Sequence, residues 1–245
     1  MQGISGNWIL VLVVLAGVAV LQFYQGRRLN ITLIKHYIHG FESNLTIRDQ
    51  LYTWIGGYSG FKADYDVDEK SIKKVEITLT LLARQSLFWL PFSYPVKRGD
   101  RLYIVLRPSF KVHADAHIIR NFYYLFGPAI REAKDLTKGK VEFPNAKGFY
   151  TLYEEEGDIA KLRKLVEASI DPKRLRHIAV VKETNVLFCL IKPDPFKTPD
   201  ELKRLVENFP KYFSNGGDAQ LGTWRTRRCV WTRWPHLGDW STDSF

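Results

Sequence analysis

The sequence predicts an α+β protein: a single N-terminal transmembrane helix followed by a cytoplasmic domain of antiparallel strands packed with helices, arranged as two lobes. Three observations predict this class. No charged residue precedes Arg27. Several later segments alternate apolar and polar residues, as half-buried strands do, and others place apolar residues at helical spacing.

Residues 4–26 form the expected transmembrane helix. Ile4 to Tyr24 is apolar apart from small or interfacial residues, and about 20 such residues cross the hydrocarbon layer of a bilayer. A secretory signal peptide has basic residues before its apolar run and a small-residue cleavage site after it. Here the basic residues come afterwards, which favours a permanent anchor over a signal peptide or a soluble core helix.

The charges around this span predict its orientation. Arg27, Arg28 and Lys35 follow it, and nothing basic precedes it. The positive-inside rule then places the N-terminus outside and residues 27–245 in the cytoplasm. We therefore expect a single-pass protein of the cell membrane.

Residues 27–140 are expected to hold a juxtamembrane helix and the first α+β lobe. Apolar residues at helical spacing in residues 30–43 predict that the anchor continues into an amphipathic helix. Asn30 and Asn44 begin glycosylation sequons, but a cytoplasmic location makes them ordinary helix and turn residues.

The rest of the first lobe reads as a turn, two strands and a helical segment. "GGYSG", which we expect to follow a helix, lacks the Lys-Ser/Thr of a phosphate loop and leads into an extended segment. Residues 73–84 and 98–110 alternate as an antiparallel strand pair. Residues 113–136 have helical spacing, interrupted at Gly127-Pro128.

Residues 141–213 are expected to form the second lobe, followed by a Trp/Arg-rich tail over residues 214–245. The predicted elements are a strand, a helix, two strands joined by a short turn, and a final helix with Thr198 as its N-cap. Their ranges are 148–155, 157–170, 175–183, 185–193 and 198–213.

No arrangement of residues predicts catalysis. His113 and His117 are four residues apart, on one face of the expected helix, but no third metal ligand and no glutamate base accompany them. Glu154 to Glu156 begin a helix, where carboxylates complement the macrodipole. We expect no enzymatic activity, no cofactor, no bound metal and no small-molecule substrate.

The charge of the chain points to macromolecular partners. The formal net charge is +10, and 14% of residues are aromatic. On a cytoplasmic domain, such an excess suits anionic lipid, RNA or acidic proteins, and it equally serves solubility. The candidates for ribosome or RNA contact are Lys161, Arg163, Lys164, Lys173, Arg174, Arg176, Arg225, Arg227, Arg228, Arg233, Trp224 and Trp231.

Residues 86–96, "SLFWLPFSYPV", are apolar, aromatic and twice broken by proline. Such a segment either caps the core or forms an exposed loop that meets lipid or a partner. The candidate contact residues in it are Trp89, Phe92 and Tyr94. The tail over residues 214–245 also has a functional and a structural alternative. Tryptophan beside arginine suits contact with RNA or with a membrane interface, but it equally suits packing on the protein's own domain.

Three segments together resemble a known family. "HGFESNLT", "FPNAKGFYTLYEEEGDIAKLRKLVEASIDPKRLRHIAVV" and "CLIKPDPFKTPDELKRLVENFPKYF" are similar to segments of calumin, the coiled-coil-domain subunit of the eukaryotic PAT complex at the translocon. The resemblance covers about residues 8–213. It implies a ribosome- and translocon-associated factor, without enzymatic activity, that helps multipass membrane proteins insert.

The departures from that family limit what is carried over. The long acidic lumenal segment is missing, so calcium binding is not expected, and the chain ends where the family continues into a charged coiled coil. A short, archaeal-type relative is the form that this suggests. The expected partners are the membrane, the ribosome, the protein-conducting channel and further insertion factors. The alternative is a membrane-anchored enzyme or sensor whose site combines residues such as His113, His117 and Glu154 to Glu156.

Overall fold

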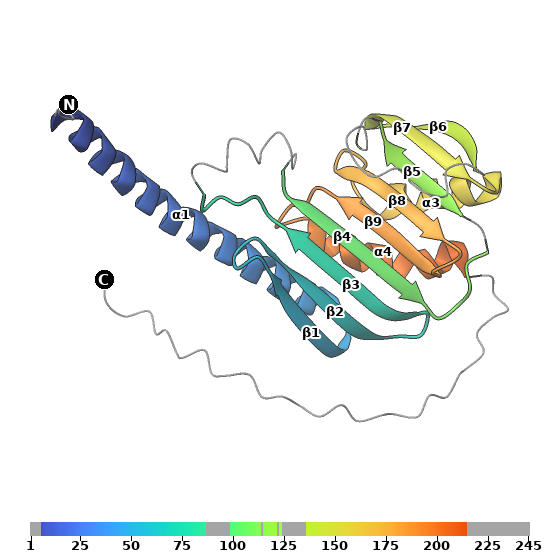
Figure 1. Cartoon of the computed structure of the whole chain (residues 1–245). Helices are drawn as coiled ribbons and strands as arrows, with labels where there is room; N and C mark the ends of the chain where they lie inside the picture. Colours follow the sequence, from blue (N-terminus) through green and yellow to red (C-terminus); the bar gives the residue numbers. More distant parts are fainter. Residues whose placement is uncertain (1–5, 87–98, 114, 122, 124–135, 215–245) are drawn as a thin grey trace.

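The computed structural model describes residues 6–86, 99–113, 115–121, 123 and 136–214. Helix α1 spans Gly6–Asn44 without interruption. The expected anchor and juxtamembrane helix are therefore one helix, about 58 Å long at 1.5 Å per residue. Its N-terminal part projects from the domain (Figure 1), and it is the one helix among the described residues long and apolar enough to span a membrane.

Within the described residues, nine strands form one antiparallel sheet beside this helix, which confirms the α+β class (Figure 1). The strand order is β1-β2-β3-β4-β9-β8-β5-β7-β6. The strands are β1 (Ile47–Ile55), β2 (Gly60–Glu69), β3 (Ile72–Thr80), β4 (Arg101–Pro108), β5 (Ala116–Arg120), β6 (Thr137–Phe143), β7 (Ala146–Tyr153), β8 (Leu175–Val181) and β9 (Val186–Ile191).

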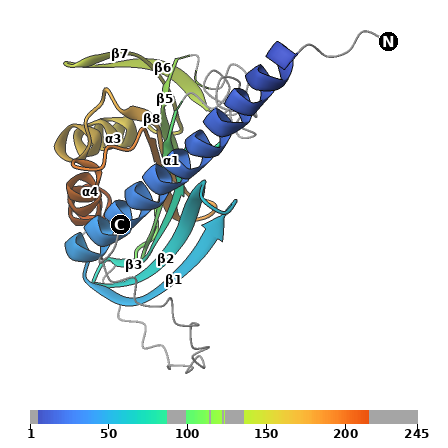
Figure 2. The ribbon, with the colours of Figure 1, turned by 90° about the vertical axis from the view of Figure 1, so that its left-hand side faces the viewer.

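The other two described helices are α3 (Glu156–Ser169) and α4 (Thr198–Phe213). With the C-terminal half of α1 they cover one face of the sheet (Figure 2). Tyr37 and Phe41 of α1, Tyr65 of β2 and Phe209 of α4 belong to one buried core between the helices and that face. The position of α1 is thus fixed by the same core that stabilises the domain.

Strands from the two expected lobes belong to the same sheet. Strand β4 belongs to the expected first lobe, and β9 belongs to the expected second lobe. The two strands pair from Leu102↔Ile191 to Leu106↔Leu187. The boundary expected near residue 140 falls inside β6.

Most predicted elements are confirmed, but the helix expected over residues 113–136 is wrong where it can be checked. Ala116–Arg120 is a strand, paired with β7 on one side and β8 on the other. Ala116, His117, Ile118 and Ile119 are all buried, so the strand lacks the polar-apolar alternation by which strands are recognised. Residues 124–135 lie outside the described part.

Two local predictions also change. "GGYSG" does not follow a helix; it forms the turn of the β1–β2 hairpin, where Gly56 and Gly57 have φ of 58° and 70°. Thr198 is the first residue of α4, whose N-cap is Lys197. The hydroxyl oxygen of Thr198 accepts a hydrogen bond from the Asp194 amide at 2.8 Å, so it stabilises the preceding turn.

Candidate functional site

The domain meets its anchor at a contact that we call the membrane-proximal junction: Gln22, Gly26 and Asn30 of α1 with Tyr58 and residues 82–85. The three helix residues are spaced four apart and therefore share one face of α1. They flank the point where the apolar run ends and Arg27 begins the charged part. In a membrane, this position is the bilayer surface.

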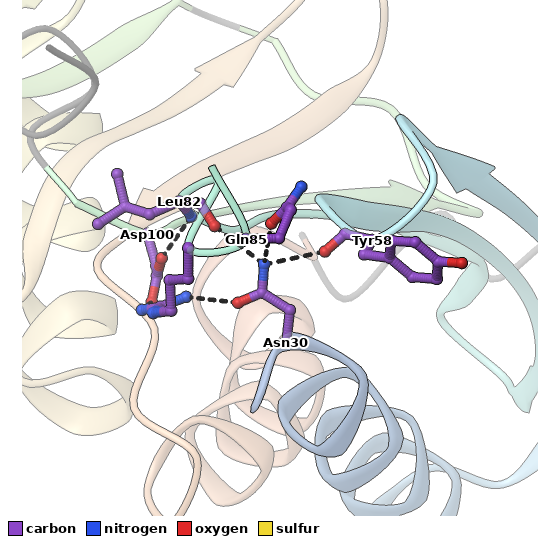
Figure 3. A network of polar contacts seen from close by, with 6 residues as sticks. Asn30, Tyr58, Leu82, Gln85 and Asp100 are labelled. Atoms are coloured by element: carbon purple, nitrogen blue, oxygen red, sulfur yellow. Dashed lines mark hydrogen bonds and ion pairs between the residues drawn. The ribbon is translucent and has the colours of Figure 1, made fainter. Parts of the chain in front are cut away.

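Asn30 is the centre of the junction (Figure 3). Its side chain is 0% exposed. The amide nitrogen Nδ2 donates to the carbonyl oxygens of Tyr58 at 3.0 Å and Leu82 at 2.9 Å, and lies 3.3 Å from Gln85 Oε1. The β1–β2 turn and the segment after β3 are thereby joined to α1 through one buried amide, which satisfies backbone groups that would otherwise be costly to bury.

Arg84 and Asp100 extend this network (Figure 3). Arg84 Nη1 donates to Asn30 Oδ1 at 2.9 Å, and its Nη2 donates to Asp100 Oδ2 at 2.6 Å. The other carboxylate oxygen of Asp100 accepts the Leu82 amide at 2.8 Å. The amide nitrogen and oxygen of Asn30 and both carboxylate oxygens of Asp100 therefore all have hydrogen-bond partners. A network in which every polar group is satisfied favours a single arrangement of its side chains.

Gly26 allows the close approach on which the junction depends. A Cβ atom at this position would lie 2.3 Å from the carbonyl oxygen of Arg84. That same oxygen accepts a hydrogen bond from Gln22 Nε2 at 3.0 Å. Any larger residue at position 26 would push the backbone of Arg84 away from the helix.

Arg27 adds a contact on the outside of the junction. Its guanidinium carbon lies 4.3 Å from the centroid of the Tyr58 ring, within the range of a cation–π interaction. Arginine and tyrosine are residue types that suit the headgroup region. The contact thus stabilises the β1–β2 turn next to α1.

The predicted basic contact residues of α3 lie on its exposed side. Lys161 and Arg163 form ion pairs within the helix, with Asp158 at 2.7 Å and Glu167 at 3.0 Å. Lys164 is exposed as well. Ion pairs at such spacing are weak, so these side chains can exchange their partner for a phosphate.

The predicted residues after α3 divide into two kinds. Lys173 is exposed, and Arg176 is half-buried, 6.0 Å from the Tyr123 ring. Arg174 is only 12% exposed; it pairs with the buried Glu201 and donates to Thr198 Oγ1 at 3.1 Å. Arg174 therefore stabilises the contact between the start of β8 and α4 and is not at the surface where RNA would bind.

The remaining predicted contact residues lie outside the described part of the chain. They are Trp89, Phe92, Tyr94, Trp224, Arg225, Arg227, Arg228, Trp231 and Arg233.

The expected pairing of His113 with His117 on a helix face is wrong, because His117 lies in β5 and His113 precedes that strand. His117 instead meets His177 of β8: Nδ1 of His117 lies 3.4 Å from Nε2 of His177, and both side chains are buried. Burial lowers the pKa of both rings, and that of His177, which His117 also depresses, falls to about 3.

The residues of the alternative enzyme hypothesis are not brought together as a site. Glu154 accepts the Asp115 amide at 3.4 Å and pairs with Lys182 at 3.8 Å, whereas His117 is buried against His177. Within the described residues, no three His, Cys, Asp or Glu side chains are grouped as metal ligands.

Sequence reasoning missed the junction. Asn30 was interpreted as an ordinary helix residue, yet it has the most connected side chain at this site. One signal was available: Gln22, Gly26 and Asn30 are small or uncharged polar residues spaced four apart at the point where the apolar run of α1 ends. Polar or small residues at that spacing indicate a helix face in contact with protein.

Comparison with protein-family models gives no match for this chain, and no characterised protein matches its sequence.

Proposed function

We propose that this chain is a non-enzymatic, membrane-anchored factor beside the protein-conducting channel that binds the ribosome or the nascent chain and assists insertion of multipass membrane proteins. The observation that carries the proposal is the membrane-proximal junction. It ties the β1–β2 turn and the segment after β3 to α1 where the apolar run of that helix ends. A domain held in this way has a fixed orientation relative to α1. It would present the same surface to each membrane protein that is inserted beside it.

Two further features support the proposal. The formal net charge is +10, as expected for a partner of RNA or anionic lipid. In the sequence, Trp89, Phe92 and Tyr94 lie between Arg84, which donates to Asn30 in the junction, and Asp100, which pairs with Arg84. We place these aromatic residues in the proposal as lipid or partner contacts at the cytoplasmic surface of the cell membrane.

Ribosome binding tests the proposal directly. The full chain in detergent micelles should sediment with ribosomes, and the affinity should fall steeply with salt, because each phosphate contact releases counterions. The double variant Lys173→Glu/Arg176→Glu should bind more weakly, with a log–log salt slope reduced by about one unit per lost contact.

The matched control makes the same charge change at the β2–β3 turn and the start of β3, with Lys70→Glu and Lys73→Glu, both exposed. It should leave the slope near that of the unmodified chain. A chain that stays in the supernatant, or a slope that both variants change equally, would count against a specific ribosome contact.

A further inference from the structure

The two edges of the sheet differ in how they meet solvent. Among the described strands, β1 and β6 are the outer ones (Figure 1). Strand β6 carries the exposed residues Lys138, Lys140 and Glu142, and such charges prevent an edge from pairing with other chains. From Gln50 to Ile55, β1 has no charge, although Leu51 and Trp54 are 62% and 51% exposed.

In the described part of the chain, the backbone of β1 also has one side that no other strand pairs with. Gln50, Tyr52 and Trp54 are opposite Tyr65, Ala63 and Phe61 of β2. The Gln50 amide donates to the Asp49 carboxylate at 2.8 Å, on the side away from β2. Because outward-facing groups recur at every second residue of an antiparallel edge, the amides of Tyr52 and Trp54 face the same open side. The Asp49 carboxylate thus binds the outward-facing amide of Gln50 at one end of β1. At the open end, Tyr52–Ile55, the outward-facing amides of Tyr52 and Trp54 remain available for pairing with another strand.

The open end is the one nearest the membrane. Helix α1 leads away from the bilayer to Asn44, and β1 then runs back until the turn at Tyr58 meets Asn30 in the junction. Figure 2 shows β1 returning alongside the C-terminal half of α1. Trp54 and Ile55 therefore end close to the bilayer surface.

We infer that the open edge of β1 binds an extended, uncharged, apolar polypeptide segment at the bilayer surface by adding it to the sheet as a tenth strand. Main-chain hydrogen bonds to Tyr52 and Trp54 supply affinity, and the exposed Leu51 and Trp54 side chains favour apolar residues. The absence of charge over Gln50–Ile55 matches a segment without charge. Under the proposed function, on which this inference rests, the segment is part of a membrane protein during insertion.

A second copy of this chain does not fit the edge in antiparallel pairing. Antiparallel pairing of β1 with another β1 reverses the direction of the second molecule. Since β1 runs opposite to α1, the two anchor helices would then point in opposite directions, and one bilayer could not hold both.

The test uses the full chain in lipid nanodiscs and a fluorescent nine-residue peptide of alternating valine and threonine. The peptide should bind, measured by fluorescence anisotropy. N-methyl groups on two consecutive central residues remove one amide donor from each edge of the peptide without changing its side chains, and should weaken binding at least about tenfold if strand pairing is the mode. This comparison uses the unmodified protein, so folding of a variant does not enter.

Variants then locate the site. Leu51→Lys/Trp54→Lys gives β1 the kind of edge that β6 has, and should weaken binding about tenfold or more. The matched control, Thr137→Lys on the exposed edge strand β6, should leave binding unchanged.

Two outcomes would overturn the inference: equal binding of the methylated and unmethylated peptides, or equal binding by the β1 variant and the control. Ribosome sedimentation separates the two proposals. If the chain sediments with ribosomes but does not bind the peptide, the proposed function stands and the strand-addition site at β1 is rejected. If the chain binds the peptide but does not sediment with ribosomes, the site at β1 stands and the ribosome contact is rejected.

Discussion

At the scale of single residues, Asn30 joins α1 to two segments that are distant in the sequence. One neutral side chain, surrounded by protein at the start of the charged part of α1, contacts segments that lie 28 to 55 residues away in the chain. An amide suits this position because it donates and accepts at once and needs no counter-charge.

Replacing this amide should be costly. In Asn30→Ala, the carbonyl oxygens of Tyr58 and Leu82 lose their donor, so we expect the free energy of unfolding to fall by about 1–3 kcal/mol. Denaturant unfolding of the full chain in micelles, followed by tryptophan fluorescence, measures it. The control is Asn44→Ala, because Asn44 Nδ2 bonds only locally, to the Gly40 carbonyl at 2.9 Å. Equal losses in both variants would contradict the central role of Asn30.

The buried histidine pair predicts how stability depends on pH. Burial, aided by His117, lowers the pKa of His177 to about 3 in the folded protein, whereas an unfolded histidine titrates near 6.5. Between about pH 6.5 and 3, His177 is therefore protonated in the unfolded chain but neutral in the folded chain. The free energy of unfolding falls as the pH drops through this range. The slope is at most about 1.4 kcal/mol per pH unit for each histidine. His177→Gln should flatten this dependence, while replacement of the exposed His39 by Gln should not.

At the scale of elements, the sequence pattern predicted those strands and helices that have one buried face. Strand β3, for instance, alternates Val75, Ile77 and Leu79 with polar neighbours, and α4 has a strong apolar stripe. The failures have physical causes. Strand β5 is buried on both faces and so resembles a helix segment. The edge strands β1 and β6 are mostly exposed and carry too few buried residues to show a period.

The site was less predictable than the fold for a related reason. The polar contacts of Asn30 depend on which turn the sheet brings to α1, and nothing near residue 30 in the sequence records that. The basic residues were visible, but whether one is exposed, as Lys173 is, or paired internally, as Arg174 is, depends on the packing of α4.

The contact between α1 and the segment after β3 gives a prediction with an internal control. In Gly26→Ala, the new methyl group would meet the Arg84 carbonyl, so the segment must move away. We expect faster amide hydrogen exchange at residues 82–85 and lower stability. Gly17→Ala has nothing within 4 Å of its new methyl group, and since alanine favours a helix over glycine it should be neutral or stabilising. Unchanged exchange in Gly26→Ala would mean that the junction tolerates the displacement.

At the scale of the whole molecule, topology is the property on which the proposals depend. A cysteine in place of Gln2 should react with a membrane-impermeant maleimide on intact cells, and one in place of the exposed Lys73 should react only after lysis. Native Cys189 is fully buried, and burial raises the pKa of its thiol, so it should react little with the reagent. The second native cysteine, Cys229, is replaced by serine in both variants. Labelling of the Lys73→Cys variant in sealed cells would reverse the orientation.

In the proposed membrane-anchored state, the unbroken course of α1 would also make the protein sensitive to the bilayer itself. The helix enters the core of the domain without a hinge, so the sheet must turn with it whenever the helix changes its angle to the membrane. Helices respond to thinner bilayers by tilting. From Gly26 to Asn44 the helix extends about 27 Å, and an added tilt of about 10° would therefore carry the far end of the domain about 5 Å sideways. The thickness of the surrounding lipid would thus set how the sheet is presented to its partners.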